Sequence, residues 1–419
     1  MARTVTFIHA ADVHLGAPFR GLRSLSDTWA HRLVDAIPQA YDRLISICIQ
    51  EQVDFLLLAG DIFDTDTVSY AHYRRFIDGL ERLDEAGIPV FLCAGNHDPF
   101  ASWNHVMDEL PTNAYLFPSD KPGFTAFEKD GEPLVLIGAR GFSNQPMDDD
   151  IALGITRARA EEACGFSAPF AIGMLHTGFT IDKRKAPCKE KTLKSAGMNY
   201  WAFGHIHQPL LFPYDHPLFA YSGCIQGRDI RETGPRGCLK VTLTEDALNE
   251  AEFIPLSSVE WEQITVDIDR FTSVMAVRDA CINAMFDKNR ESQCEEMVVR
   301  LTLTGKTPLH ELLSVPTQAE ELRASINENV STFYCDAIID KTSSPRNSEA
   351  LRAQGLFPAT VFDAADKMLQ NVAEEKESLE SEFIKRSLGL PTNIEKHYTE
   401  FVEEARELVL DMLGDDTRG

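Results

Sequence analysis

The sequence predicts an α/β protein whose first part is an αββα sandwich, in which two sheets pack together with helices on their outer faces. Two observations support this fold. Apolar, strand-like runs alternate with helical patterns at first, and more closely spaced strand-like runs then follow up to residue 255. Such a pattern is typical of layered sheets around a shared core. We expect a small α/β cap domain and a C-terminal helical hairpin after the sandwich, with domains at 1–258, 259–341 and 342–419.

The strands of the sandwich are predicted from short runs rich in Leu, Val, Ile and Phe, which are typical of strands buried on both faces. These runs cover residues 5–10, 55–59, 90–94, 134–137, 171–175, 201–203, 218–221, 238–243 and 252–255. Helices are predicted at 35–50 and 69–86, where apolar residues recur every three or four positions. Gly87 and Pro89 mark the end of the second helix.

The chain after Trp261 repeats this alternation on a smaller scale. The predicted elements are strands at 263–268, 297–304 and 333–339 and helices at 274–285 and 320–326. The polar, turn-rich segment 342–348 is the expected linker. Beyond it, apolar stripes at helical spacing run from Phe362 to Phe383 and from Ile394 to Met412, on either side of 389–391. They predict two helices that form a hairpin.

The composition indicates an ordinary globular protein. Its 419 residues are 44% hydrophobic, which is enough for a full core and more than one domain. The N-terminus enters a predicted strand without the apolar core of a signal peptide, and no apolar run reaches membrane-spanning length, so we expect a cytoplasmic protein with no membrane partner. The nine cysteines are scattered without a Cys-x-x-Cys pair, which favours reduced core thiols over disulfides or a structural zinc site.

The net charge of −25 opposes a general affinity for nucleic acid, because Lys and Arg supply most of the attraction to phosphate chains. The charge does not exclude a local site. Divalent cations and a few basic side chains can draw a polyanion into one cleft while the rest of the surface stays acidic.

Five short blocks of metal-binding side chains follow five of the predicted strands. They are Asp12-Val13-His14, Gly60-Asp61-Ile62-Phe63-Asp64, Gly95-Asn96-His97-Asp98, the lone His176, and Gly204-His205-Ile206-His207. Side chains that leave the ends of several strands converge at one rim of a sheet. The order and chemistry of the blocks therefore predict a two-metal hydrolase site.

A two-metal site needs a carboxylate that bridges the cations and terminal ligands on each side. Asp61 is the expected bridge. The other expected ligands are Asp12, His14 and His207 for one cation and Asn96, His176 and His205 for the other. Imidazole, carboxylate and amide oxygen suit Mn, Fe or Zn, and Mn is the first expectation.

His97 follows Asn96 directly, so we expect it to lie beside the cations without binding them. There it can donate a proton to the departing oxygen of a substrate. Asp98 or Asp64 is expected to orient His97 or one of the ligands. Two cations would activate an attacking water and stabilise the charge that develops on phosphorus.

The five blocks resemble the D-x-H, G-D-x-x-D, G-N-H-D, H and G-H-x-H motifs of the calcineurin-like metallophosphoesterase superfamily. Residues 7–16 are similar to the I-L-H-x-S-D-x-H-L-G of SbcD-like DNA repair exonucleases, and 59–65 and 221–238 agree with the YhaO-type branch. The resemblance implies the ligand and proton-donor roles given above. Ala11 departs from the family pattern, which usually has Ser or Thr, and so lacks a hydroxyl behind the ligands.

The resemblance also implies a function, namely a DNA exonuclease or endonuclease in DNA repair that works with an SMC-like coiled-coil ATPase of the SbcC kind. A homodimer is compatible with it. One alternative is a phosphoesterase that acts on small molecules or phosphoproteins, and another is a noncatalytic subunit that binds DNA ends. The same metal site serves all of these, so the ligands alone do not separate them.

Basic side chains near the blocks are candidates for contacts with a substrate backbone. They are Lys183, Arg184 and Lys185 after His176, and Arg228 and Arg231 in the Gly-rich stretch after His207. The alternative is a solvated run of charge. The C-terminal hairpin likewise either packs on its own domain or docks a helix of a coiled-coil partner. His9 is expected to have a packing or supporting role.

Overall fold

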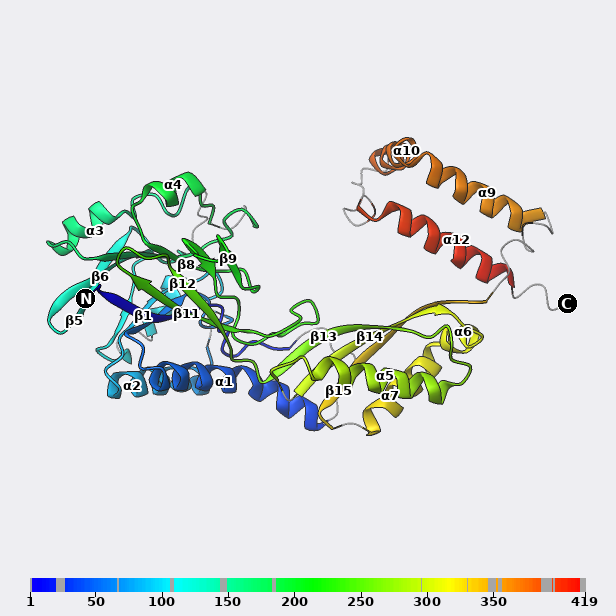
Figure 1. Ribbon diagram of the computed structural model, residues 1–419, viewed down its shortest axis with the longest axis horizontal. Helices are drawn as coiled ribbons and strands as arrows, with labels where there is room; N and C mark the ends of the chain where they lie inside the picture. Colours follow the sequence, from blue (N-terminus) through cyan, green and yellow to red (C-terminus); the bar gives the residue numbers. More distant parts are fainter. Residues whose placement is uncertain are drawn as a thin grey trace. The chain divides into compact units, whose positions relative to one another are not determined.

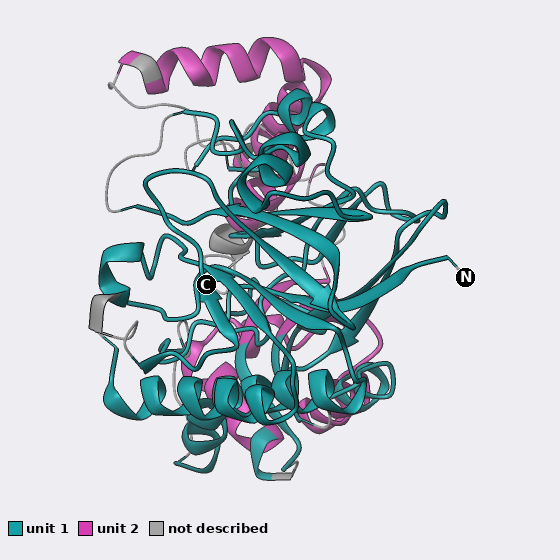
Figure 2. Cartoon of the chain, turned by 90° about the vertical axis from the view of Figure 1, so that its left-hand side faces the viewer, with its two compact units in different colours: residues 1–264, 285–300, 327–337 teal, residues 265–284, 301–326, 338–419 magenta. Residues whose placement is uncertain are grey.

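The computed structural model describes residues 2–19, 27–65, 68–105, 109–143, 149–182, 186–294, 296–329, 331–345, 352, 356–385, 394 and 396–414. The chain divides into two compact units, coloured separately in Figure 2. Unit 1 comprises residues 1–264, 285–300 and 327–337, and unit 2 comprises residues 265–284, 301–326 and 338–419.

Unit 1 contains two six-stranded mixed sheets, with the strand orders β12-β11-β1-β2-β3-β4 and β5-β6-β7-β8-β10-β9. The strands are β1 (Thr4–Ala10), β2 (Phe55–Ala59), β3 (Val90–Cys93), β4 (Ala114–Leu116), β5 (Gly123–Lys129), β6 (Glu132–Arg140), β7 (Phe170–His176), β8 (Tyr200–Gly204), β9 (Leu210–Phe212), β10 (Phe219–Tyr221), β11 (Gly237–Thr244) and β12 (Glu250–Pro255). Strands β1 to β4 pair in parallel, as do β6, β7, β8 and β10. The remaining pairings are antiparallel.

The core between the two sheets is built from alternate residues of their strands. Phe7 and Phe55 of the first sheet belong to one buried cluster with Val135 and Ile172 of the second. Successive side chains of a strand point to opposite faces, so the neighbouring residues are available for a second layer outside each sheet.

Helices cover the outer faces of both sheets (Figure 1). On the first sheet, Ile8 and Leu56 belong to a cluster with residues of α1 (Asp27–Gln50) and α2 (Tyr70–Glu85). On the second sheet, Trp201 packs in a cluster with residues of α3 (Arg157–Cys164) and α4 (Glu190–Ser195). A short 3₁₀ helix, Phe100–His105, follows the third strand. Unit 1 is thus the αββα sandwich that the sequence predicts.

Helix α1 begins at Asp27, well before the predicted start at 35. Its first turns bury Trp29 and Leu33 in a cluster with Val259 and Trp261. These partners lie more than two hundred positions away in the sequence, so the local periodicity used for the prediction does not reveal the extension.

The second part of the chain contains a three-stranded sheet in the order β13-β14-β15. Its elements are β13 (Val259–Asp267), α5 (Val274–Asn289), β14 (Glu296–Lys306), α6 (His310–Leu313), α7 (Pro316–Asn329) and β15 (Phe333–Ser343). Each of the three strands contributes residues to both compact units. The predicted linker is wrong at its start, because β15 continues through Ser343, and its residues 346–348 lie outside the described residues.

The C-terminal helices are α9 (Leu356–Gln370), α10 (Val372–Lys385) and α12 (Tyr398–Gly414). The stripe predicted as a single helix from Phe362 to Phe383 is two helices, separated at Asn371, a residue type whose side chain competes with helical hydrogen bonds. The apolar faces of the stripes meet, as expected for a hairpin, in a cluster that contains Ala365, Tyr398 and Val402. The turn predicted at 389–391 lies outside the described residues.

None of the helices in the described part of the chain combines the length and the apolar content needed to cross a membrane. The nine cysteines are free thiols, and all but Cys164 are buried.

Candidate two-metal active site

Neighbouring parallel strands of both sheets deliver the predicted ligands to one place in unit 1. Asp12 and His14 follow β1, whereas Asp61 follows β2, and the adjoining loops are joined by backbone bonds from Asp12 N–H to the Gly60 carbonyl at 3.0 Å and from His14 N–H to the Asp61 carbonyl at 3.0 Å. Asn96 follows β3. In the second sheet, His176 ends β7 and the pair His205 and His207 follows β8.

Several of these residues have an unusual backbone conformation. The φ angles of Asp12, His14 and Asp61 are 50°, 52° and 52°, and that of His205 is 99°. A positive φ costs a non-glycine residue about 1–3 kcal/mol, and such residues cluster at functional sites where the fold determines the conformation. Here the turned backbone directs consecutive ligand blocks into one cluster.

The glycine before three of the blocks is required by close packing. A Cβ atom at Gly60 would lie 2.5 Å from His176 Nδ1, and one at Gly95 would lie 2.1 Å from Asp61 Oδ1. A Cβ at Gly204 would lie 2.1 Å from the Ala59 carbonyl oxygen. These motif glycines therefore let the ligand loops approach each other.

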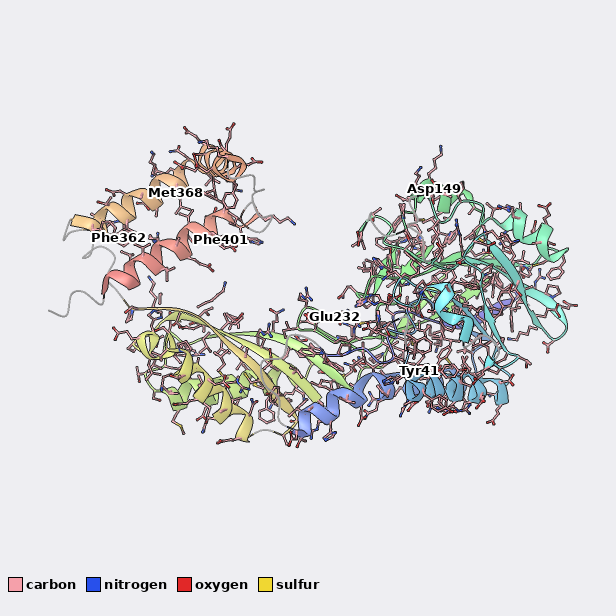
Figure 3. The ribbon with its side chains drawn as sticks, turned by 180° about the vertical axis from the view of Figure 1, so that it is seen from behind. Tyr41, Asp149, Glu232, Phe362, Met368 and Phe401 are labelled. Atoms are coloured by element: carbon pink, nitrogen blue, oxygen red, sulfur yellow. The ribbon has the colours of Figure 1, made fainter. Side chains whose placement is uncertain are left out.

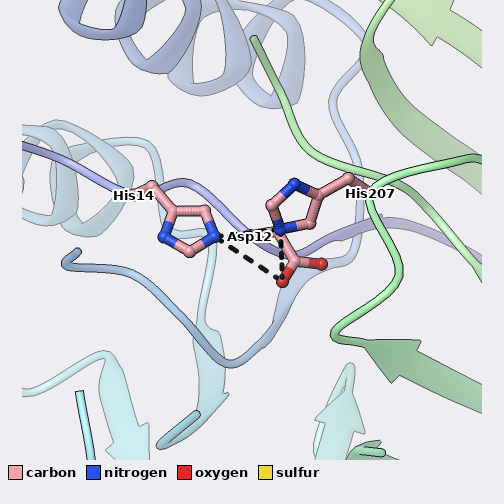
Figure 4. A group of neighbouring side chains, drawn as sticks. All are labelled: Asp12, His14 and His207. Atoms are coloured by element: carbon pink, nitrogen blue, oxygen red, sulfur yellow. Dashed lines mark hydrogen bonds and ion pairs between the residues drawn. The ribbon is translucent and has the colours of Figure 1, made fainter. Parts of the chain in front are cut away.

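The first group of predicted ligands consists of Asp12, His14 and His207 (Figure 4). The Nε2 atoms of His14 and His207 are 3.2 Å apart and lie 3.9 Å and 3.8 Å from Asp12 Oδ1. The Asp12 and His14 side chains are almost completely buried.

The second group consists of Asp61, Asn96, His176 and His205. The Asn96 side-chain oxygen lies 3.2 Å from His176 Nε2 and 2.8 Å from His205 Nδ1. Asp61 Oδ2 lies 3.3 Å from His176 Nε2 and 3.8 Å from His14 Nε2, so Asp61 reaches both groups. This is the position expected of a bridging carboxylate.

The spacing of these atoms fits divalent cations. Metal bonds of about 2.1 Å place neighbouring ligand atoms of one cation roughly 3 to 3.5 Å apart. The 3.2 Å between the His14 and His207 nitrogens and the 3.3 Å between His176 and Asp61 match this spacing. The set of imidazole, carboxylate and amide oxygen donors suits Mn, Fe or Zn.

The electrostatics also favour cations. Burial opposes a charge on His176, yet the carboxylate of Asp61 raises the pKa of this imidazole to about 9. Burial likewise opposes ionisation of Asp61, and the surrounding histidines outweigh it and lower the pKa of the carboxyl. The buried carboxylates thus create a negative potential at the point where the ligand atoms converge.

His97 lies at the rim of the cluster, with 42% of its side chain exposed. Its Nδ1 is 3.0 Å from the backbone carbonyl oxygen of Asp64, and its ring contacts that of His14 edge-on with centroids 5.0 Å apart. A carbonyl oxygen only accepts hydrogen bonds, so Nδ1 carries a proton and Nε2 is the atom available to a substrate.

Of the two carboxylates considered for orienting His97, the structure places Asp64 against it. Asp64 Oδ1 lies 3.6 Å from His97 Nδ1 and 3.1 Å from His14 Nδ1. Burial opposes ionisation of Asp64, but its contacts with His14 and Arg228 lower its pKa to about 2. It therefore acts as a carboxylate beside both histidines.

Asp98 contacts the loops of the site. Its carboxylate accepts backbone N–H groups from Gly95 at 2.7 Å, from Ile62 at 2.8 Å and from Phe63 at 3.2 Å. Asp98 thus joins the loop after β2 to the loop after β3. These bonds connect it to the backbone that carries Asp61 and His97.

The predicted substrate-binding residues lie in different surroundings. Arg228 donates from Nη1 to Asp64 Oδ1 at 2.7 Å, and its side chain is only 16% exposed. Arg231 has 83% of its side chain exposed and pairs with Asp229 at 2.8 Å. Lys183, Arg184 and Lys185 lie outside the described residues.

Two carboxylates that contact predicted ligand histidines could not be identified from the sequence motifs. Glu232 Oε1 lies 2.5 Å from His207 Nδ1, and Asp182 Oδ2 lies 3.6 Å from His205 Nε2. Glu232 was visible only as part of the stretch 221–238, and no spacing rule links it to His207. A search for acidic residues in the loop after His176 would have found Asp182, whereas Glu232 lies beyond two further strands from His207 and carries no such signal.

His9 has the packing role that was expected. It is fully buried, with Nδ1 2.9 Å from the Tyr200 hydroxyl and Nε2 3.2 Å from the Phe203 carbonyl oxygen. Since His9 belongs to β1 and its partners to β8, these bonds connect the two sheets.

Two family models match the chain. That of the calcineurin-like phosphoesterases covers residues 5–209, which include all the ligand blocks, and that of the middle domain of the metallophosphoesterase YhaO covers residues 261–343. The chain is 33% identical over 312 residues to the uncharacterized metallophosphoesterase YhaO of Bacillus subtilis, with 74% of each protein aligned. This chain belongs to the YhaO-type calcineurin-like metallophosphoesterases.

More distant similarity links this YhaO-type protein to two archaeal proteins named DNA double-strand break repair protein Mre11. The identity is 24% with the Aeropyrum pernix protein, covering 57% of this chain and 58% of the relative, and 24% with the Archaeoglobus fulgidus protein, covering 54% and 51%. Family membership makes the YhaO-type chain a metal-dependent phosphoester hydrolase that uses divalent metal ions.

Proposed function

We propose that this YhaO-type protein is a two-metal phosphodiesterase that cleaves DNA as an exonuclease or endonuclease in DNA repair. The observation that carries the proposal is the pairing of a buried two-cation ligand set with an exposed imidazole at its rim, that of His97. A rim histidine of this kind serves a substrate that approaches from solvent, as a long polymer must.

The residues have distinct roles in this proposal. Asp12, His14 and His207 would hold one cation and Asn96, His176 and His205 the other, with Asp61 within reach of both groups. When bound, the cations supply Lewis acidity that activates water and stabilises the charge developing at phosphorus. Mn is the proposed metal, with Fe and Zn as alternatives.

His97 supplies the proton that the leaving oxygen needs. Its Nδ1–H is held by the Asp64 carbonyl, so the protonated ring presents Nε2–H to the substrate. The Asp64 carboxylate lies 3.6 Å from Nδ1. Asp98 positions His97 through the backbone bonds that it accepts at Gly95.

The choice of DNA as substrate is supported by the similarity to proteins named for double-strand break repair. It is also supported by basic residues near the ligand blocks. Arg231 has an exposed side chain in the stretch after His207, and Lys183, Arg184 and Lys185 follow His176 in the sequence. Such residues are candidates for contacts to a phosphate backbone, which place a nucleic acid without reading its sequence.

The proposed partner is an SMC-like coiled-coil ATPase of the SbcC kind, in the cytoplasm. The C-terminal helices support this proposal because they form an apolar groove of about 500 Å³. Met368 on α9 and Phe401 on α12 line it (Figure 3). An amphipathic helix is the usual occupant of such a groove. A homodimer is the alternative assembly.

A nuclease assay tests the proposed function. The full chain is incubated with Mn²⁺ and end-labelled duplex or single-stranded DNA, with and without the ATPase, in parallel with cyclic nucleotides, a phosphopeptide and bis(p-nitrophenyl) phosphate. Cleavage of DNA supports the proposal. Turnover of only the cyclic nucleotide or the phosphopeptide supports a small-molecule or phosphoprotein phosphoesterase. DNA-end binding without cleavage of any diester supports a noncatalytic subunit.

A further inference from the structure

A continuous chain of polar contacts runs behind the first group of ligands. It starts at His207, whose Nδ1 lies 2.5 Å from Glu232 Oε1, and the other oxygen of Glu232 accepts the backbone N–H of Arg228 at 2.7 Å. The Arg228 guanidinium then donates to Asp64 Oδ1 at 2.7 Å, and this oxygen lies 3.1 Å from His14 Nδ1.

The chain of contacts sets the tautomer of His207. A carboxylate accepts hydrogen bonds, so Glu232 holds a proton on His207 Nδ1, whereas Asp64 Oδ1 approaches His14 Nδ1 as an ion-pair contact at 3.1 Å. His207 then presents an unprotonated Nε2 toward Asp12, 3.2 Å from the Nε2 atom of His14. A carboxylate behind a ligating imidazole also increases its basicity and fixes its orientation.

The histidines of the second group have different partners behind their rings from those of the first group. His176 Nδ1 faces the backbone carbonyl of Ala59 at 3.0 Å, which is an uncharged acceptor. His205 points Nδ1 toward Asn96, and its Nε2 is 3.6 Å from Asp182, longer than the carboxylate contacts of the first group. The two groups therefore differ in the charge behind their histidines.

We infer that Glu232 and Arg228 are positioning residues that make the Asp12–His14–His207 position the tighter of the two cation sites. Glu232 acts through His207, and Arg228 acts through Asp64 on His14 and His97. This inference rests on the ligand roles proposed above and adds an order of affinity to them. Glu232 (labelled in Figure 3) belongs to the segment between β10 and β11.

The contact of Glu232 with His207 and the contact of Arg228 with Asp64 can be tested separately. Arg228 binds Glu232 through its backbone and Asp64 through its side chain, so Arg228→Ala removes only the contact to Asp64. Glu232→Gln removes the negative charge behind His207 and keeps the shape of the side chain. Glu245→Gln is a matched control, since Glu245 pairs with Arg3 on the surface away from the ligands.

The experiment measures Mn²⁺ binding to the full chain by isothermal titration calorimetry and electron paramagnetic resonance. We expect two unequal sites in the wild type. Glu232→Gln should weaken the tighter site roughly 10- to 100-fold and leave the other unchanged, as for other partners of ligating histidines. Glu245→Gln should bind as the wild type does.

A double-mutant cycle separates positioning from a general structural effect. If Glu232 acts through His207, Glu232→Gln should cause no further loss in a His207→Gln background but should retain its effect in a His176→Gln background. Two Mn²⁺ bound with equal affinity, an unchanged tighter site in Glu232→Gln, or equal weakening of both sites would each overturn the inference while leaving the proposed function intact. Absence of Mn²⁺ binding by the wild type would overturn both.

If Glu232→Gln does not fold, Arg228→Ala provides the second test. It should also weaken the tighter site without changing the other, because His14 loses part of its support. A circular dichroism spectrum without metal confirms that each variant is folded.

Discussion

At the scale of single residues, the site contains histidines whose tautomer is set by a fixed hydrogen-bond partner. His97 Nδ1 faces a carbonyl and His207 Nδ1 faces a carboxylate. Nε2 is therefore available to a substrate in His97 and to a cation in His207. In the proposed mechanism, the side chains divide accordingly into buried ligands, an exposed proton donor and supporting carboxylates. This division makes their effects separable by mutation.

The role of His97 predicts a loss of rate without a loss of metal. His97→Asn should lower kcat for a phosphodiester about 10²- to 10⁴-fold, because a positioned acid typically contributes this much. The affinity for Mn²⁺ should not change, since His97 is not a ligand. Steady-state kinetics with metal titration checks this, and unchanged hydrolysis by the variant would refute the proton-donor role.

Arg228 and Arg231 offer a matched pair. Arg228→Ala should reduce turnover of both DNA and a small diester by at least about tenfold, because its guanidinium contacts the carboxylate beside His97 and His14. Arg231→Ala should leave the small diester unaffected and weaken only DNA cleavage, more so at low salt, since this side chain is exposed. Equal effects of the two changes on both substrates would contradict these assignments.

At the scale of elements, the strands and the blocks that follow them were predictable because each carries a local signal. Apolar runs marked β1, β2, β3, β7 and β8, and a motif follows each of them or includes its last residue. Strands β4 and β9 were not predictable because three residues are too few to carry a periodic signal. The start of α1 was not predictable because it packs against residues far away in the sequence. Glu232 was missed for the same reason, because its contact with His207 arises only when two loops meet.

Close packing of the ligand loops predicts the effect of Gly95→Ala. The added Cβ would collide with Asp61, so Mn²⁺ affinity should fall at least about tenfold and stability should decrease by roughly 1–3 kcal/mol. Gly87→Ala is the control, because Gly87 has a φ of +71° and open space around it. It should cost about 1–2 kcal/mol of backbone strain and leave metal affinity unchanged. Calorimetry of both variants with Mn²⁺ checks that Gly95→Ala weakens metal binding and Gly87→Ala does not.

The bonds of His9 between the sheets predict a pH dependence of stability. Burial lowers the pKa of His9 to about 3, whereas an unfolded histidine has a pKa near 6.5. The unfolded state therefore binds the proton more readily between these values, so the contribution of His9 is fully present above pH 6.5 and decreases as the pH falls. Between pH 6.5 and 4.5, the free energy of unfolding of His9→Asn, measured with denaturant, should fall by about 2 kcal/mol less than that of the wild type. An equal fall in both proteins would contradict this.

At the scale of the whole molecule, the metal site lies entirely in unit 1 and the C-terminal groove entirely in unit 2. The two functions proposed for them, hydrolysis and partner docking, should therefore be separable. The predicted domain boundaries at 258 and 341 remain predictions of the sequence. They coincide closely with the start and end of the match to the YhaO middle domain at 261–343.

The groove predicts a selective loss of partner binding. Phe401→Glu introduces a charge into its lining and should weaken association with a coiled-coil ATPase at least about tenfold, with diester hydrolysis unchanged. Leu408→Glu is the control, since Leu408 is 62% exposed on the same helix and is not among the groove residues. Deletion from Leu356 onward should abolish association. A tail-less protein that still binds the ATPase would refute docking at these helices.

We propose that ligands following five strands converge on two cations. Anomalous diffraction from crystals grown with Mn²⁺ locates such cations. We expect two Mn²⁺ peaks, roughly 3.5 to 4 Å apart, with Asp61 between them. A single peak with Asn96 and His176 turned away, or no peak at these residues, would contradict it.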